Sequence, residues 1–254
     1  MSNNEIKNID FNCNLADLSI ENDLEKSFEI LEYMSSVNIA CGIHAGNPLL
    51  IKRAIEHCKF KNKVIGALIG LPENITTPQT LTEEDIEAIV LYQLGALSSF
   101  AKAYSLNIEQ VRPDGNMYRF ASENLDFSVN VAKAVKKYSK WFTLLGASGE
   151  ILDKTAQELN INVAHEICIE KQYTNSAINY DMANICDSDT VIERIKNLIK
   201  TSEINNTDGA KSIVKADTVH FSIDLSVETV KESANIIVPR PVNFNKAVVS
   251  GWVE

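Results

Sequence analysis

The sequence predicts an α/β fold: a seven-stranded parallel (β/α) barrel, TIM-like, formed by a single domain over residues 1–254. Short apolar runs alternate with amphipathic stretches along the chain, a pattern typical of strand–helix units with right-handed crossovers and a parallel sheet. The 254 residues, of which 45% are hydrophobic, suffice for one barrel core. No G-x-G-x-x-G or G-x-x-x-x-G-K-[ST] motif follows an expected strand, which favours a closed barrel over an open nucleotide-binding sheet.

Seven strands are expected, because seven short apolar runs have the size of buried parallel strands. In chain order they cover residues 9–13, 37–41, 64–68, 110–112, 141–145, 163–167 and 218–223. Seven helices are expected between and after them, where longer stretches carry apolar residues at helical spacing. The helices cover residues 23–34, 48–59, 83–104, 123–138, 150–159, 189–200 and 227–237. Residues 201–211 are expected to be a polar connector.

Two helix starts carry capping signals. Asn47 precedes Pro48, which places a side-chain cap before a proline at the first helical position. Thr82 and Asp85 have the spacing of a capping box. Both signals support the expected starts of the second and third helices.

Composition and charge exclude several classes of function. The net charge of −10 is spread along the chain, which argues against a nucleic-acid partner. The longest apolar stretch, residues 64–71, is too short to span a membrane. The polar start lacks the pattern of a secretion signal, so a cytoplasmic location is expected. The five cysteines are odd in number and not closely paired, which fits reduced thiols.

Polar residues gather where the expected strands end. In a parallel barrel the carboxyl ends of the strands share one mouth, and active sites form there. The polar residues that follow the expected strands are Asn14, Asp17, His44, Asn47, Glu73, Arg112, Asp114, Glu166, Glu170, Lys171 and Asp224. The sequence therefore predicts a polar site at this end of the barrel.

Six segments carry a resemblance to a known family. The stretch from Asn38 reads N-I-A-C-G-I-H-A-G-N-P and resembles the hallmark of the LamB/YcsF family, which includes the 5-oxoprolinase A subunit. Five further segments agree in order and spacing: I-D-F-N-C-N-L-A-D from Ile9, Y-Q-L-G-A-L from Tyr92, R-P-D-G-N-M-Y from Arg112, H-E-I-C-I-E-K-Q-Y-T from His165 and D-T-V-H-F-S-I-D from Asp217. The resemblance covers nearly the whole chain.

The resemblance implies a barrel of the glycoside hydrolase and carbohydrate deacetylase type. It implies a protein that acts with 5-oxoprolinase subunits B and C in the ATP-dependent hydrolysis of 5-oxoproline, a small carboxylated lactam, to glutamate. ATP is the cofactor implied for the complex. A lactam is a poor electrophile, so activation of its carbonyl group by ATP before water attacks has a clear chemical reason.

The chain departs from the family pattern at ionisable positions. An aspartate is replaced by Asn14, and three histidines are replaced by Leu68, Asp114 and Ser222. An amide cannot act as a general base, and a leucine can neither bind a metal nor transfer a proton. We therefore expect no metal in this chain. Because no phosphate-binding loop motif is present and the net charge is strongly negative, we also expect that the isolated chain does not turn over ATP.

The strand-end positions and the resemblance together give a candidate site. The expected acid–base residues are His44, Asp114, Glu166 and Asp224. The expected substrate-binding residues are Asn12, Asn14, Asn38, Gly46, Arg112 and Tyr118. Within this site, His44 would transfer a proton or polarise a carbonyl, and Arg112 would bind an anionic group.

Several side chains have structural alternatives. Asn12 and Asn38 are equally expected as buried amides that brace the first two loops, and Arg112 can instead pair with Asp114. Structural roles are expected for Glu170 and Lys171 as a loop ion pair, for His165 and His220 in the strands, and for Trp141 in the core.

Two other functions are alternatives to the 5-oxoprolinase function. One is a catalytically silent paralogue that binds a small molecule or holds partner subunits together. The other is a carbohydrate deacetylase-like hydrolase, which the replaced metal-binding residue types disfavour. Genes for the two partner subunits next to the gene for this chain would favour the 5-oxoprolinase function.

Overall fold

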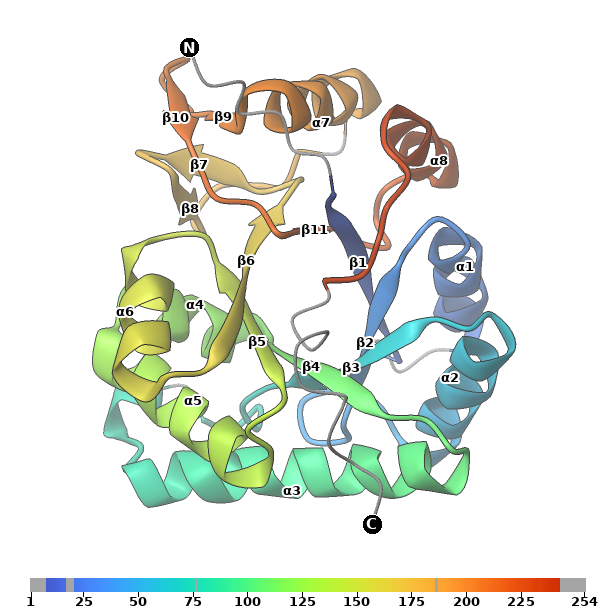
Figure 1. Cartoon of the computed structure of the whole chain (residues 1–254), viewed down its shortest axis with the longest axis vertical. Helices are drawn as coiled ribbons and strands as arrows, with labels where there is room; N and C mark the ends of the chain where they lie inside the picture. The colour runs from blue at the N-terminus through green and yellow to red at the C-terminus, as the bar shows by residue number, and fades with distance from the viewer. Residues whose placement is uncertain (1–7, 17–20, 76, 186, 243–254) are drawn as a thin grey trace.

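A closed barrel forms the centre of the molecule (Figure 1). The computed structural model describes residues 8–16, 21–75, 77–185 and 187–242. Within these ranges, seven parallel strands close in the order β1-β11-β6-β5-β4-β3-β2. The predicted seven-stranded parallel barrel is therefore confirmed.

The barrel strands are β1 (Asp10–Leu15), β2 (Ser36–Ala40), β3 (Val64–Ile69), β4 (Ile108–Pro113), β5 (Thr143–Ala147), β6 (Asn162–Cys168) and β11 (Thr218–His220). Each overlaps one expected strand, with its ends displaced by a few residues. Trp141 lies before β5 and is 37% exposed, so its predicted place in the core is wrong.

The helices are α1 (Glu21–Leu31), α2 (Pro48–Phe60), α3 (Glu83–Ala103), α4 (Gly115–Glu123), α5 (Leu125–Tyr138), α6 (Glu150–Leu159), α7 (Ser188–Thr201) and α8 (Val227–Ile236), with a short 3-10 turn, η1, at Pro78–Thr80. Both predicted caps are confirmed. Asn47 accepts the backbone N–H groups of Leu49 and Leu50, and Thr82 forms a reciprocal capping box with Asp85.

The sequence did not predict α4. The single helix expected over residues 123–138 is α5, and α4 precedes it from Gly115. Asn124 separates the two helices because its backbone is extended and its side chain accepts the Phe127 N–H, which starts α5. Only Asp114 separates α4 from strand β4, and the run Asp-Gly-Asn at this junction is typical of a loop.

Two small hairpins lie beside each other outside the barrel. One is formed by β7 (Gln172–Thr174) and β8 (Ala177–Asn179), and the other by β9 (Glu203–Asn205) and β10 (Lys211–Ile213). The Thr207 N–H donates to the Tyr173 carbonyl at 2.8 Å and joins them. The expected polar connector over residues 201–211 therefore contains β9 and the start of β10.

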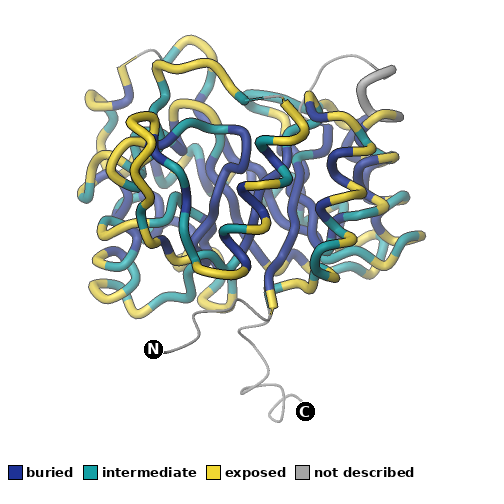
Figure 2. The backbone as a smooth tube through the Cα atoms, turned by 90° about the horizontal axis from the view of Figure 1, so that it is seen from above, coloured by how far each residue is buried: buried dark blue, intermediate teal, exposed yellow. Residues whose placement is uncertain are grey.

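The strand alternation divides polar from apolar side chains. In β1, Phe11, Cys13 and Leu15 belong to the hydrophobic core, whereas Asp10 and Asn12 contact polar groups of other barrel strands. Figure 2 shows the buried strands at the centre, with exposed residues at the periphery. The barrel interior is thus a polar column enclosed by an apolar layer under the helices.

None of the helices in the described ranges is long and apolar enough to cross a membrane.

Candidate functional site

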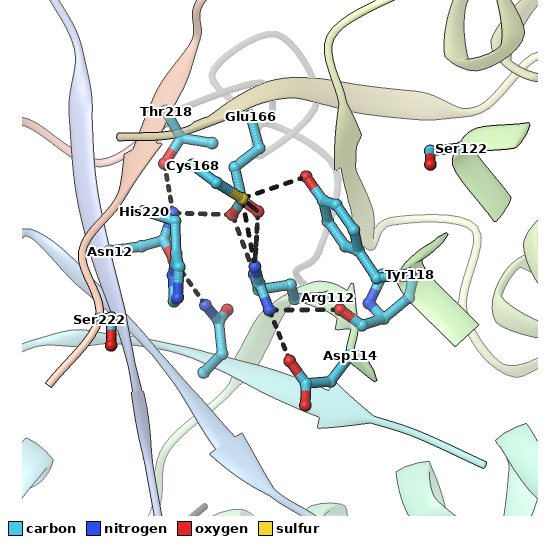
Figure 3. A network of polar contacts seen from close by, with 12 residues as sticks. Asn12, Arg112, Asp114, Tyr118, Ser122, Glu166, Cys168, Thr218, His220 and Ser222 are labelled. Carbon is cyan, nitrogen blue, oxygen red and sulfur yellow. Dashed lines mark hydrogen bonds and ion pairs between the residues drawn. The ribbon is translucent and has the colours of Figure 1, made fainter. Parts of the chain in front are cut away.

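An ion pair links β4 to β6 across the barrel interior (Figure 3). The Nε atom of Arg112 lies 3.0 Å from both carboxylate oxygens of Glu166, and its Nη2 atom lies 2.8 Å from Oε2. Both residues are buried. Burial alone would raise the pKa of Glu166, but the Arg112 guanidinium outweighs it and holds the pKa at about 2. Glu166 is therefore ionised at neutral pH.

Asn12 and Asn38 form a hydrogen-bond network that extends from Glu166 of this ion pair. The Asn12 Nδ2 group donates to Glu166 Oε1 at 3.0 Å and to Thr218 Oγ1 at 2.7 Å. Its Oδ1 atom accepts from Asn38 Nδ2 at 2.9 Å, and Asn38 Oδ1 accepts from Gln110 at 2.9 Å. Both asparagines are fully buried and bonded to one another, an arrangement that favours the structural alternative over a substrate contact.

The polar column ends at Asp10. Its carboxylate accepts hydrogen bonds from Ser35, Ser36 and Thr218 at 2.6 to 2.8 Å. Burial nevertheless raises the pKa of Asp10 to about 6. A carboxyl group with a raised pKa therefore lies deep in the barrel, away from the mouth.

A cavity of about 540 Å³ opens at the carboxyl ends of β4, β6 and β11. The lining also includes the start of α4 and the segment around the β7–β8 hairpin. It comprises Arg112, Asp114, Gly115, Asn116, Tyr118, Arg119, Cys168, Glu170, Lys171, Ile178, Tyr180, Asn184, His220 and Ser222. We call this space the mouth cavity. Its position agrees with the site expected at the strand ends.

His44 and Arg112 meet through Asp114 at this mouth. Asp114 Oδ1 accepts from the Nη1 group of Arg112 at 2.9 Å, and its Oδ2 lies 3.7 Å from His44 Nε2. Gly70 permits the position of His44, because a Cβ atom there would overlap the imidazole ring. The three side chains lie at one end of the barrel as expected, although the lining of the mouth cavity includes Arg112 and Asp114 but not His44.

The surroundings of Arg112 differ from those of a free anion-binding group. Its Nε and Nη2 groups face Glu166, its Nη1 group faces Asp114, and the Tyr118 ring lies 4.8 Å from the guanidinium carbon. The alternative of a pair with Asp114 is therefore correct, although the pair is partly buried and not a surface one. Since its donors are committed, the structure does not support Arg112 as the substrate anchor.

Glu170 differs most from its expected role. It was expected in a loop ion pair with Lys171, but it is 3% exposed, lines the mouth cavity and accepts the backbone N–H of Ser222. Burial raises the pKa of Glu170 to about 7, against the lowering effect of backbone hydrogen bonds. Arg194 on α7 holds this loop through the carbonyl groups of Ile169 and Lys171, at 3.0 and 2.6 Å.

His220 also lines the mouth cavity, although the sequence favoured a core role. Its Nδ1 atom lies 2.8 Å from Asn12 Oδ1. Burial and the nearby Arg112 charge lower the pKa of His220 to about 3, so the ring is neutral at physiological pH. The available sequence signal was its place at a strand end, two residues before Ser222.

Four other predicted site residues lie outside the lining of the mouth cavity. Glu166 is fully buried and ionised at neutral pH, which disfavours the predicted acid–base role. Asp224 is exposed beyond β11, and Asn14 lies in β1 in register with Asn38. Gly46 has a φ of +83°, and a Cβ atom there would lie 3.1 Å from the Ala40 carbonyl. Gly46 thus serves loop packing.

The described ranges contain no group of three or more His, Cys, Asp or Glu side chains arranged to hold a metal ion. Leu68, which stands where the family pattern has histidine, is fully buried and lies in register with Arg112.

Comparisons with known proteins agree with one another. The model of the LamB/YcsF family matches residues 9–243. The 5-oxoprolinase A subunit of Bacillus anthracis (strain A0248) is 31% identical over 219 residues, which is 83% of this chain and 87% of that protein. The protein of the same name from Alkaliphilus metalliredigens (strain QYMF) is 29% identical, over 83% of this chain and 85% of that one. A crystal structure of the lactam utilization protein from Thermus thermophilus is similar with a TM-score of 0.80 and 26% identity, covering 90% of this chain and 96% of the other.

Proposed function

The chain belongs to the LamB/YcsF family, and from this premise we propose that it is the lactam-binding subunit of a cytoplasmic, ATP-dependent 5-oxoprolinase. The complex would hydrolyse 5-oxoproline to glutamate together with 5-oxoprolinase subunits B and C. Relatives that carry the name of the 5-oxoprolinase A subunit and a similar structure titled lactam utilization protein support this proposal.

The size and polarity of the mouth cavity support a small carboxylated lactam as substrate. The volume of about 540 Å³ lies within the range of small-molecule sites. Lys171 lines the cavity and has no ion-pair partner among the described residues, so it is the cation available to a substrate carboxylate. Arg112 shapes the same wall but is neutralised by its own carboxylates.

The position of Glu170, a buried carboxyl group in the wall of the mouth cavity, is the single observation that carries the catalytic part of the proposal. Opening a lactam requires one proton to leave the attacking water and one to reach the departing nitrogen. A carboxyl group with a pKa of about 7 is populated in both protonation states near neutrality, which suits this exchange. Asp114 and His44 form a second polar group at the rim of the same mouth.

The residues of the mouth cavity do not fit a triphosphate. The carboxyl groups of Asp114 and Glu170 line the cavity, and the N–H donors of Arg112 are already bonded to Glu166 and Asp114. The sequence also has no phosphate-binding glycine motif. We therefore assign the handling of ATP to a partner protein of the complex and expect the isolated chain not to hydrolyse ATP.

Reconstitution with the cognate partner subunits tests the proposed function. We expect ATP-dependent release of glutamate from 5-oxoproline by the complex, and none when this chain is omitted. Glutamate release that is unaffected by omission of the chain would contradict the proposal.

The silent-paralogue function has one observation in its favour, because Asn14 and Leu68 stand where the family pattern has ionisable groups. The silent-paralogue function predicts a different result for the reconstituted complex. The chain would bind 5-oxoproline and the partners, yet the complex would release no glutamate. Calorimetric binding to the isolated chain, measured beside turnover, separates these two functions.

A further inference from the structure

The buried network fixes the orientation of the Asn12 amide. Glu166 is ionised, so both of its oxygens can only accept hydrogen bonds. The Asn12 atom 3.0 Å from Glu166 Oε1 must therefore be the Nδ2 donor. Its carbonyl oxygen is then directed at Asn38 Nδ2 and at His220 Nδ1. The charge on Arg112 thus decides which end of a neighbouring amide faces His220.

The orientation of Asn12 in turn fixes the tautomer of His220. An amide oxygen has no proton to give, so His220 Nδ1, at 2.8 Å, must donate. The ring is neutral, which leaves Nε2 with a lone pair and no proton. Nε2 has no hydrogen-bond partner among the described residues and keeps access to solvent, while His220 itself lines the mouth cavity. The barrel interior therefore presents one fixed acceptor to whatever occupies the cavity.

We propose that His220 Nε2 accepts a hydrogen bond from the ring N–H of a cyclic amide bound in the mouth cavity. The inference rests on the proposed function and names the contact by which the site recognises a lactam. A lactam carries a single N–H donor, and a site that pairs with it rejects a ring of the same shape that lacks it. His220 is thus a specificity-determining residue that contacts substrate, whereas Asn12, Glu166 and Arg112 act through it as positioning residues.

A pair of ligands tests this assignment. The first is 5-oxoproline, and the second is 3-oxocyclopentane-1-carboxylate, in which a CH₂ group replaces the ring N–H and the carboxylate and carbonyl are kept. We expect calorimetry on the intact chain to give roughly tenfold to hundredfold tighter binding of the lactam, because the ketone leaves Nε2 unpaired.

Two variants locate the source of this preference. His220→Leu should bind the two compounds within about threefold of each other, because the acceptor is gone. Asn116→Leu changes the same cavity but leaves the His220 ring intact, so it should retain the preference. A preference that survives in His220→Leu, or that disappears in Asn116→Leu, overturns the assignment of His220 while leaving the proposed function standing. If neither compound binds to the wild-type chain, the proposed function fails and the inference fails with it.

Nitrogen NMR on the unmodified protein gives a measurement that needs no variant. The chain has only four histidines, so their imidazole signals can be assigned. We expect His220 to show a protonated Nδ1 and an unprotonated Nε2 throughout pH 6 to 8, with the Nε2 signal shifting when 5-oxoproline is added. A protonated Nε2 in the free protein, or an Nε2 signal that does not respond to bound 5-oxoproline, contradicts the proposal.

Discussion

Arg112 holds two carboxylates in place, and this makes it the most consequential single side chain of the barrel interior. Truncation in Arg112→Ala would leave Glu166 ionised, buried and without its cation. We expect the free energy of unfolding to fall by about 3 to 5 kcal/mol, the usual cost of breaking a buried pair from one side. Urea denaturation measures this loss.

Arg119→Ala is the matched control for that experiment. Arg119 lines the same cavity, but its pairs with Glu123 and Asp181 are exposed, so its removal should leave the stability close to wild type. Equal losses for the two arginines would show that the buried pair has no special role.

Glu170 should make the stability of the protein depend on pH. Its folded pKa of about 7 lies above the ordinary value of 4.5, so between these values the folded state keeps a proton that the unfolded state releases. Stability therefore falls as pH rises through this window, and the loss is complete above pH 7. Glu170→Gln removes this titrating group. The free energy of unfolding of the variant, relative to that of wild type, should therefore increase by up to about 3 kcal/mol between pH 4.5 and 8.

Denaturation of both proteins at pH 5 and pH 8 measures this difference. Asp10 titrates in the same range but is present in both proteins, so its contribution cancels. Glu228→Gln, on the exposed surface of α8, is the control and should show the same difference from wild type at both pH values. A Glu170→Gln curve parallel to that of wild type would rule out a titrating Glu170.

At the level of elements, helix α7 anchors the loop that carries Glu170 and Lys171. Arg194 donates from α7 to two carbonyl groups of this loop. In Arg194→Met, we expect the Ile169 and Lys171 amides to exchange hydrogen at least about tenfold faster, since hydrogen bonds from a charged group are lost. Hydrogen exchange followed by NMR measures this, and Lys196→Met, exposed on the same helix, is the control. Unchanged exchange in Arg194→Met would show that α7 does not hold the loop.

The elements that the sequence predicted best have strong local signals. Helix α2 begins where Asn47 and Pro48 predicted, because a side-chain cap acts within one turn of the chain. Helix α4 and the hairpins lacked such signals. Strand β9 pairs with β10 in a ladder of only three residues, and the neighbouring Asn206 bridges to Tyr173 of β7, a contact distant in the sequence.

At the level of the whole molecule, we expect the purified chain to contain well under one equivalent of any transition metal. The residue types at the family positions are an amide at Asn14, an alkyl group at Leu68 and a single carboxylate at Asp114. Elemental analysis of the isolated protein checks this, and treatment with a chelator should leave its ligand binding unchanged. About one equivalent of zinc that is lost together with binding would contradict the prediction.

The candidate site was only partly predictable, because its chemistry arises between strands. The sequence located the mouth and brought His44, Arg112 and Asp114 to it, since strand ends of a parallel barrel converge. It could not show that Arg112 is neutralised by Glu166, 54 residues away, or that burial moves the Glu170 pKa to about 7. Both properties depend on which side chains meet across the interior.

The bridge that Arg112 makes between Glu166 and Asp114 implies strong epistasis at these three positions. A change at Arg112 or Glu166 alone leaves a buried partner charge without its main counterion, whereas replacing both, together with Asp114, by apolar groups of similar volume removes the charges together. Randomising position 112 alone should therefore yield few folded proteins other than those with arginine. Randomising positions 112, 114 and 166 jointly should yield a second class of folded variants, in which all three side chains are uncharged. Any series of single substitutions that leads to this class passes through an unstable variant.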